Sequence, residues 1–168
     1  GGAISLTAPS IVSSGTNYVA GQSVDIVLTS DGSDGGAVGS SANSLQLAVA
    51  QLAIQTDGAN AYVKSPGAGL SIGVGTDGIN VGTGALSIVA AGPITQTRSI
   101  LAASVNLSAT NGSITLSDSG NAFTTAVLTT VAGDATLYDS AALTITSASV
   151  DGDLSLTSAG AIGQTGAI

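Results

Sequence analysis

Short alternations of apolar and polar residues recur along the whole chain. Each unit has an aliphatic residue, a small or polar residue and a second aliphatic residue, as in Leu86-Ser87-Ile88. Because successive side chains of a strand point to opposite faces, each unit predicts a short strand with one buried face. Gly, Asp, Asn and Ser fill the intervals, which favours turns between the strands. The other units are Ile4-Ser5-Leu6, Val24-Asp25-Ile26, Leu45-Gln46-Leu47, Leu70-Ser71-Ile72, Ile79-Asn80-Val81, Val105-Asn106-Leu107, Ile114-Thr115-Leu116, Ala135-Thr136-Leu137, Leu143-Thr144-Ile145 and Leu154-Ser155-Leu156.

The interval between equivalent units is about 20 residues, within the range of solenoid repeats. Val105 follows Leu86, and Ala135 follows Ile114, each at nearly this distance along the chain. A period of this length that contains strands and turns, without helix signals, predicts an all-β solenoid whose strands stack on their equivalents one coil later. At about 20 residues and about 4.8 Å per coil, the 168 residues predict about eight coils and a rod on the order of 40 Å long.

Two longer echoes support a repeat. The string Thr-Asp-Gly-Ala-Asn at positions 56–60 returns one predicted period later, at positions 76–80, as Thr-Asp-Gly-Ile-Asn. Segments 84–100 and 152–168 share nine of 17 aligned positions, and both contain an Ile-x-Gln-Thr string. We therefore expect one solenoid segment over residues 1–168.

The Gly-, Ser- and Asp-rich stretch over residues 29–44 does not follow this pattern. We expect it to leave the coil as a loop, because connecting segments of this composition run over the surface. It can be a binding loop, in which Asp31 and Asp34 would contact a ligand, or a tolerated surface insertion.

The composition excludes several classes of protein. Lys64 and Arg98 are the only cations against ten Asp, and the net charge of −8 excludes a nucleic-acid binder. Without Cys or His, the chain has no ligands for structural zinc, no disulfides and no Ser-His-Asp triad. The scarcity of aromatic residues fits a narrow interior.

No apolar stretch approaches the ~18 residues of a transmembrane helix, and the N-terminus does not resemble a signal peptide. We interpret the chain as a processed or excised part of a longer protein.

One string could bind calcium. Residues 72–80 resemble a single calcium-binding nonapeptide repeat, and Asp77 is its candidate ligand. Such sites need adjacent turns that surround one ion, and a second copy directly after the first is missing. The alternative is an ordinary Asp-Gly corner.

Paired carboxylates are candidates for glycoside cleavage. The pairs are Asp31 with Asp34 and Asp151 with Asp153. Such an enzyme needs one carboxyl with a raised pKa, an ionised partner and usually aromatic or basic residues that hold sugar. Those residues are nearly absent, so we expect no enzymatic activity and no cofactor.

Two Thr-x-Thr pairs raise a third possibility, an ice-binding solenoid. They lie at residues 95–97 and 144–146. A water-ordering surface would need such a pair on most successive coils, and here the pairs are sporadic.

The repeats resemble those of one family of large secreted bacterial proteins. The strings that carry the resemblance are Gly-x-Leu-Ser-Leu-Thr-Ser-Ala-Gly-x-Ile-x-Gln-Thr at 152–165, Gly-Ser-Ile-Thr-Leu-Ser-Asp-Ser-Gly-Asn-Ala-Phe at 112–123 and Ile-Thr-Gln-Thr at 94–97. They are similar to repeats of filamentous-haemagglutinin-like and autotransporter adhesins. The resemblance implies a right-handed parallel β-helix, secretion through the outer membrane and a role at the cell surface. It implies the shaft of an adhesin, because no secretion, translocation or receptor-binding module is recognisable.

These observations lead to one expected function and two alternatives. We expect a non-enzymatic, extracellular shaft or filament segment of adhesin or biofilm type, which stacks head to tail through open ends or continues in a longer chain. The partners would be further copies and a host or matrix glycan or protein, with no nucleic acid and no membrane insertion. The alternatives are a glycan- or protein-binding module that uses the 29–44 loop, and ice binding.

Overall fold

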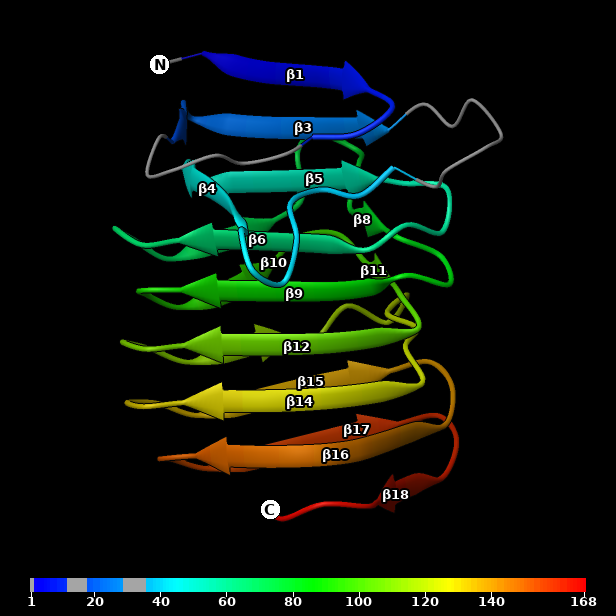
Figure 1. Cartoon of the computed structure of the whole chain (residues 1–168). Coiled ribbons are helices and arrows are strands. Elements are labelled where there is room, and N and C mark those ends of the chain that lie inside the picture. Colours follow the sequence, from blue (N-terminus) through cyan, green and yellow to red (C-terminus); the bar gives the residue numbers. More distant parts are fainter. Residues whose placement is uncertain (1, 12–17, 29–35) are drawn as a thin grey trace.

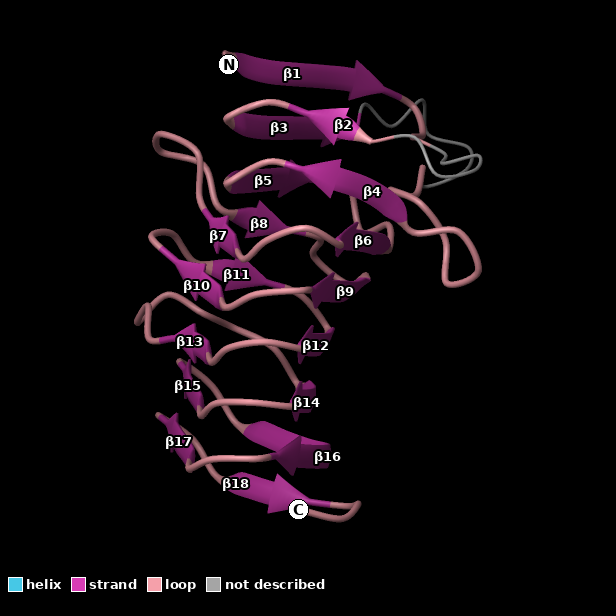
Figure 2. Cartoon of the chain, turned by 90° about the vertical axis from the view of Figure 1, so that its left-hand side faces the viewer, coloured by secondary structure: helices cyan, strands magenta, loops and turns pink. Residues whose placement is uncertain are grey.

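The computed structural model describes residues 2–11, 18–28 and 36–168, and this part of the chain forms one parallel β-solenoid without helices. Two sheets lie on opposite sides of a common axis (Figure 2). Sheet A has ten strands, and sheet B has eight. In order along the axis, sheet A contains β1 (Ala3–Ala8), β3 (Ser23–Leu28), β5 (Gln51–Gln55), β7 (Leu70–Ile72), β10 (Ile94–Gln96), β13 (Ile114–Leu116), β15 (Ala135–Asp139) and β17 (Leu154–Ser158), with β8 (Ile79–Asn80) and β11 (Ile100–Leu101) beside this path. Sheet B contains β2 (Val19–Ala20), β4 (Leu45–Ala48), β6 (Ala61–Ser65), β9 (Ala85–Ala90), β12 (Ser104–Ala109), β14 (Thr125–Thr130), β16 (Leu143–Val150) and β18 (Ile162–Gln164).

The coil is right-handed and has about seven turns. In Figure 1 the front strands of sheet B point left and the strands of sheet A behind them point right, while the chain descends from the N-terminus. The expected number of eight turns was too high because the N-terminal turns are longer than the regular repeat. Val24 pairs with Leu52, and Ala61 pairs with Leu86, and both steps along the chain exceed the step from Leu86 to its partner Val105.

The strand register confirms the predicted spacing in the C-terminal half. Leu86 pairs with Val105, and Ile114 pairs with Ala135, as their intervals predict. The two similar strings at residues 56–60 and 76–80 are not one coil apart. Asn80 pairs with Gln55 instead, because the turn between them is longer than the echo implies.

Rows of aliphatic side chains fill the interior between the sheets. In sheet B, Val63, Ile88, Leu107 and Leu128 are consecutive partners, and each is at most 1% exposed. Burying one such side chain contributes about 1.5–3 kcal/mol, so these rows are the main source of stability. The interior also accommodates one aromatic ring, that of Phe123, which is 3% exposed.

The echo between segments 84–100 and 152–168 relates strands of opposite sheets. Leu86 lies in β9 of sheet B, whereas its counterpart Leu154 lies in β17 of sheet A. Likewise, Ile94 lies in sheet A and Ile162 in sheet B. The echo therefore spans three and a half turns, so the same string of strand, corner and strand begins once in sheet B and once in sheet A.

The Asp-Gly pairs of the chain differ in backbone conformation. Gly58, after Asp57, has a φ of +80°, a left-handed conformation that favours glycine. Gly78 and Gly152, which also follow Asp, are not among the glycines with positive φ. An Asp-Gly pair in this chain therefore indicates a turn but does not determine the backbone geometry of that turn.

Part of the expected 29–44 loop, including Asp31 and Asp34, lies outside the described residues. Within the described part, Val38 is fully buried and bridges Ile11 and Ala61 in parallel. The residues that follow, 40–44, form a loop that hangs over the front of sheet B (Figure 1).

Candidate functional site

The end strands of both sheets each leave one edge unpaired among the described residues. In sheet A, β1 pairs only with β3, and β17 pairs only with β15. In sheet B, β2 pairs only with β4, and β18 pairs only with β16. Inward-facing aliphatic side chains are partly exposed at these edges. Ile162, for example, is 49% exposed, whereas its partner Leu143 in the preceding turn is 1% exposed. Both ends therefore present free backbone groups beside incompletely buried aliphatic rows.

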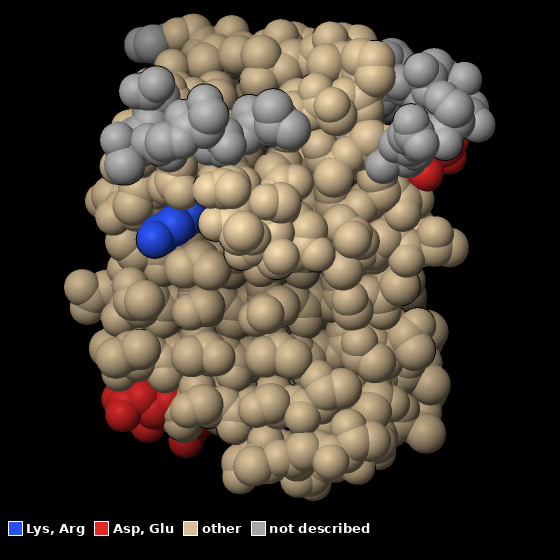
Figure 3. Space-filling view, viewed as in Figure 1, with Lys and Arg blue, Asp and Glu red and all other residues tan. Residues whose placement is uncertain are grey.

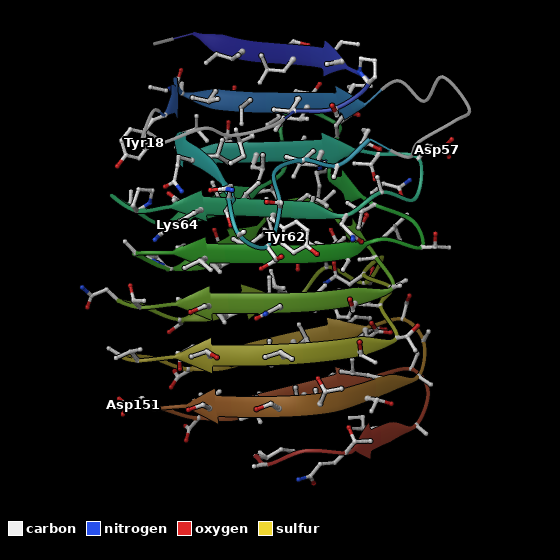
Figure 4. The ribbon with its side chains drawn as sticks, viewed as in Figure 1. Tyr18, Asp57, Tyr62, Lys64 and Asp151 are labelled. Atoms are coloured by element: carbon white, nitrogen blue, oxygen red, sulfur yellow. The ribbon has the colours of Figure 1, made fainter. Side chains whose placement is uncertain are left out.

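The outer face of sheet B carries a shallow trough of about 490 Å³. The overhanging loop borders it, and hydroxyl, amide and small apolar side chains line it. A space-filling view shows that this face bears almost no charge (Figure 3). Lys64 lies on the other side of the loop, in a second hollow of about 320 Å³ (Figure 4). The trough lining includes Ser44, Tyr62, Ser87, Asn106, Thr125 and Thr146.

Loops interrupt sheet A at the same position in three successive turns. β5 is one continuous strand. In the next turn the chain forms two strands, β7 and β8, which pair with successive parts of β5, and residues 73–78 protrude between them. Residues 97–99 and 117–121 interrupt the following turns. The first two loops are tied together because Arg98 Nε donates to the Gly75 carbonyl at 3.0 Å. The result is a ridge along one side of the rod.

A polar side chain replaces an aliphatic one in the interior beneath this ridge. Ile26, Ile54, Ile79 and Ile100 form a continuous row, and Asn121 follows it in the next turn with no exposed surface. A buried amide is costly unless its donors and acceptors are bonded. Its hydrogen bonds therefore decide whether this turn is stable.

The Asn121 amide is fully bonded. Its Oδ1 accepts from the Ile100 N–H and from Gln96 Nε2, both at 2.9 Å. Its Nδ2 donates to Gln96 Oε1 at 2.9 Å and to the Tyr138 carbonyl at 3.2 Å. The two side-chain amides thus form a reciprocal pair that joins three turns.

Asp139, the next inward polar residue of this region, is also fully buried. Its carboxyl oxygens accept from the Phe123 N–H at 2.9 Å and from the Ala141 N–H at 2.7 Å. Asp139 therefore caps backbone donors of two turns, which is a structural role.

The Gln of the Ile-x-Gln-Thr strings closes the turn after its strand. Gln96 Nε2 donates to the Arg98 carbonyl at 2.7 Å, and Gln164 Nε2 donates to the Gly166 carbonyl at 2.8 Å. In both cases the acceptor lies two positions after the Gln. The recurring Gln is explained by this local bond in both sheets.

Asp77, the calcium candidate, lies at the tip of the first ridge loop. Its backbone forms a tight antiparallel bridge with Val74, so the Asp-Gly pair belongs to the loop that protrudes between β7 and β8 and not to a corner of the coil. Its acidic neighbour is Asp25, whose half-buried carboxyl has an Oδ1 without a hydrogen-bond partner. Burial raises the pKa of Asp25 above its ordinary value of 3.8, and the charge of Asp77 raises it further. Among the described residues, no three acidic side chains gather where they could hold a metal ion.

The other candidate residues lie apart. Asp151 and Asp153 are exposed at the corner between β16 and β17, where the Asp153 N–H donates to Asp134 Oδ1 at 2.9 Å. Asp57 lies at the opposite edge of the coil (Figure 4). Two of the few aromatic residues, Tyr62 and Tyr138, lie on sheets B and A, respectively, so they form no common surface on which a sugar could stack.

The two Thr pairs also lie on different sheets. Thr95 belongs to β10 of sheet A, and Thr144 belongs to β16 of sheet B. The outer face of sheet A has a single row instead, in which Ser71 pairs with Thr95 and Thr115 pairs with Thr136. No face of the described coil carries the doubled Thr row that ice binding requires.

A protein-family model describes most of this coil. It is the family of repeats of unknown function DUF5649, which matches residues 58–130 and 132–168. The chain belongs to this family. The first match begins at the corner before β6, and the break between the matches falls at Val131, in the turn after β14. The DUF5649 matches thus cover the turns from β6 to β18, including the three loops of the ridge.

Comparisons with curated proteins and with solved structures found no match. Within the described residues, no helix is long and apolar enough to span a bilayer.

Proposed function

We propose that this chain is a non-enzymatic structural shaft of a secreted bacterial surface adhesin, in which coils stack head to tail along one axis. The observation that carries the proposal is the continuity of the interior rows up to both end strands. Leu137 is 1% exposed, and its partner Leu156 in the last turn is only partly buried. A further coil would complete these rows and satisfy the free strand edge.

The free energy of such a junction is modest. Completing the burial of a half-buried Leu or Ile contributes about 1 kcal/mol, and each new backbone hydrogen bond contributes about 0.5–1.5 kcal/mol. Association of separate molecules costs about 4–15 kcal/mol. We therefore expect separate copies to stack only at high protein concentration, whereas coils of one longer chain avoid this cost.

The sides of the rod suit a shaft. The outer face of sheet B is nearly uncharged, and the net charge of −8 resides on Asp side chains, several of which lie at corners and loops. Repulsion between these charges keeps neighbouring rods apart while leaving the ends free to meet. The repeat family and the β-solenoid fold are compatible with a structural repeat protein.

Electron microscopy of the purified chain over a range of concentrations tests the proposal. Filaments about as wide as one coil are expected at high concentration. Leu156→Lys places a charge in the interior row of the last turn and should abolish them, whereas Ser155→Lys, outward-facing on the same strand, should not. Monomers that persist at all concentrations, with both variants folded, would refute head-to-tail stacking. Labelling of intact cells with an antibody against the chain tests the surface location.

A second candidate function is ligand binding at the trough on sheet B. It is favoured by the loop at residues 40–44, which borders a lining of hydroxyl and amide groups with one aromatic ring, Tyr62. Shortening this loop should abolish binding to a glycan array if the chain is a binding module. Unchanged surface attachment after the deletion would leave the shaft as the function.

A further inference from the structure

We infer that, in the head-to-tail contact, β1 of one copy pairs in parallel with β17 of another copy, with Ile4 beside Leu154 and Leu6 beside Leu156. The inference rests on the proposed shaft function and specifies its partner and its register. It starts from the fact that β1 and β17 are the two end strands of the same sheet, each with one edge unpaired among the described residues.

The direction of the contact follows from the fold. Every pairing between two strands in sheet A is parallel, so a copy that continues the sheet along the axis presents β1 to β17 in the same direction. Two copies related by a two-fold axis would instead join β1 to β1 in antiparallel fashion, and the coil could not continue. Head-to-tail contact alone preserves the winding.

The inward and outward alternation restricts the register to even steps. Ile4, Leu6 and Ala8 face inward on β1, as Leu154, Leu156 and Ser158 do on β17. A shift by a single residue would expose every interior side chain, so only even shifts remain. Three registers then keep at least two inward residues of each strand opposite one another. The one that places Leu6 beside Leu154 leaves Ile4 opposite Gly152, without an aliphatic neighbour, so two candidate registers remain.

The two registers differ in how well apolar groups match. If the interior rows continued straight, Ile4 would lie beside Leu156, and Leu6 would lie beside Ser158, leaving Leu154 without an aliphatic neighbour. A shift of two residues, about 6.6 Å along the strand, places Ile4 beside Leu154 and Leu6 beside Leu156. It also places Ala8 beside Ser158. The shifted register buries every exposed aliphatic residue of both strands, so we assign it to the junction.

Register changes between neighbouring turns already occur within this coil. Between β14 and β16, Ala126 pairs with Ile145 while Val127 pairs with Ser147, so the register moves by a single position at a bulge. The extra residue of the bulge keeps inward residues opposite one another on both of its sides, with Ala126 beside Ile145 and Leu128 beside Ala148. A shift at a junction has to meet the same condition.

Cysteine pairs in the full-length chain test the register, because the native chain has no Cys. In-register residues of neighbouring strands are about 4.8 Å apart, within disulfide range, whereas a two-residue offset places them about 8 Å apart. The variant Ser5→Cys with Ser155→Cys reports the shifted register, and Ser5→Cys with Thr157→Cys reports the straight one. All three side chains are exposed. The Ser5→Cys single variant reports a β1–β1 contact.

After mild oxidation at filament-forming concentration, the Ser155 pair should give a ladder of linked oligomers on a non-reducing gel, at least tenfold stronger than the Thr157 pair. A stronger Thr157 ladder, or filaments by microscopy with neither ladder, overturns the register and leaves the shaft intact. Dimers from Ser5→Cys alone that match the double variant overturn head-to-tail contact. Absence of both filaments and ladders overturns the proposed function itself. Circular dichroism confirms that each variant is folded.

Discussion

Replacing Asn121 by Ala tests whether the buried amide pair holds the central turns together. The side chain makes four hydrogen bonds of 3.2 Å or less, two of them with Gln96 and one each with the Ile100 N–H and the Tyr138 carbonyl. Alanine removes all four. It also leaves the Ile100 N–H in the interior without an acceptor.

The expected loss follows from these contacts. Each hydrogen bond contributes about 0.5–1.5 kcal/mol, and a buried donor without a partner costs about 1–3 kcal/mol. A total of about 4 kcal/mol is therefore expected, although Gln96 keeps its bond to the Arg98 carbonyl. For a chain of this size, a loss of about 1 kcal/mol lowers the Tm by about 2–4 °C, so the Tm should fall by about 8–16 °C.

Thermal unfolding followed by circular dichroism measures this change, with Ser119→Ala as the control in the same exposed loop. Amide hydrogen exchange shows where along the chain the stability is lost. The Ile100 amide should lose protection, whereas the Ala102 amide, bonded to the Ala122 carbonyl, should retain more. If Asn121→Ala melts at the same temperature as the native chain and the Ile100 amide stays protected, the amide pair contributes nothing and the reasoning is wrong.

Two further predictions concern charge and close packing. The raised pKa of Asp25 means that its ionised form is disfavoured in the folded chain, so this group favours folding below pH 3.8 and ceases to do so as pH rises through the raised value. Asp25→Asn should therefore raise the Tm at neutral pH by a small amount, with the difference vanishing in acid; a constant difference across a pH series would contradict this. Gly84→Ala should cost about 1–3 kcal/mol in chemical denaturation, because its Cβ would collide with the Ala59 carbonyl oxygen. Gly67→Ala, whose Cβ meets nothing within 4 Å, should be neutral or stabilising by up to about 1 kcal/mol, and equal effects at the two sites would disprove the packing argument.

The strands that the sequence predicts are those whose outward residue is small or polar. Each aliphatic-polar-aliphatic unit lies in or overlaps a strand. The pattern missed seven of the described strands. Among them, β6 and β14 have Tyr62 and Val127 at outward positions, and β10 and β18 have a Gln in place of the second aliphatic residue. An apolar outward residue removes the alternation on which the prediction depends, even though the strand packs in the same way.

The longer turns were not predictable from the period. Asp77 and the residues around it leave sheet A as a protruding loop, and this insertion makes the turn longer than the echo between residues 56–60 and 76–80 suggests. In a chain of few residue types, a similar string arises at a corner and at a loop tip alike. Only the strand pairing in the structure distinguishes a string at a corner from a string at a loop tip.

The polar interior could not be predicted from the sequence either. Asn121 and Asp139 resemble the turn residues that fill every interval of this chain, and nothing local marks them as buried. Most of their partners come from neighbouring turns, far away along the chain. The Gln of the Ile-x-Gln-Thr strings was visible as a repeat, but its bond to the carbonyl two positions later depends on a turn geometry that the string does not specify.

A strand with its following corner makes a half-turn, and the same string serves in either sheet, so the two sheets of this rod accept the same sequences. Duplicating a single half-turn would rotate everything downstream by half a revolution about the axis. A feature such as the ridge would then pass to the other side of the molecule, while the interior rows carried on without a break. Growth by whole turns lengthens such a rod, and growth by half-turns also decides which way each of its features points.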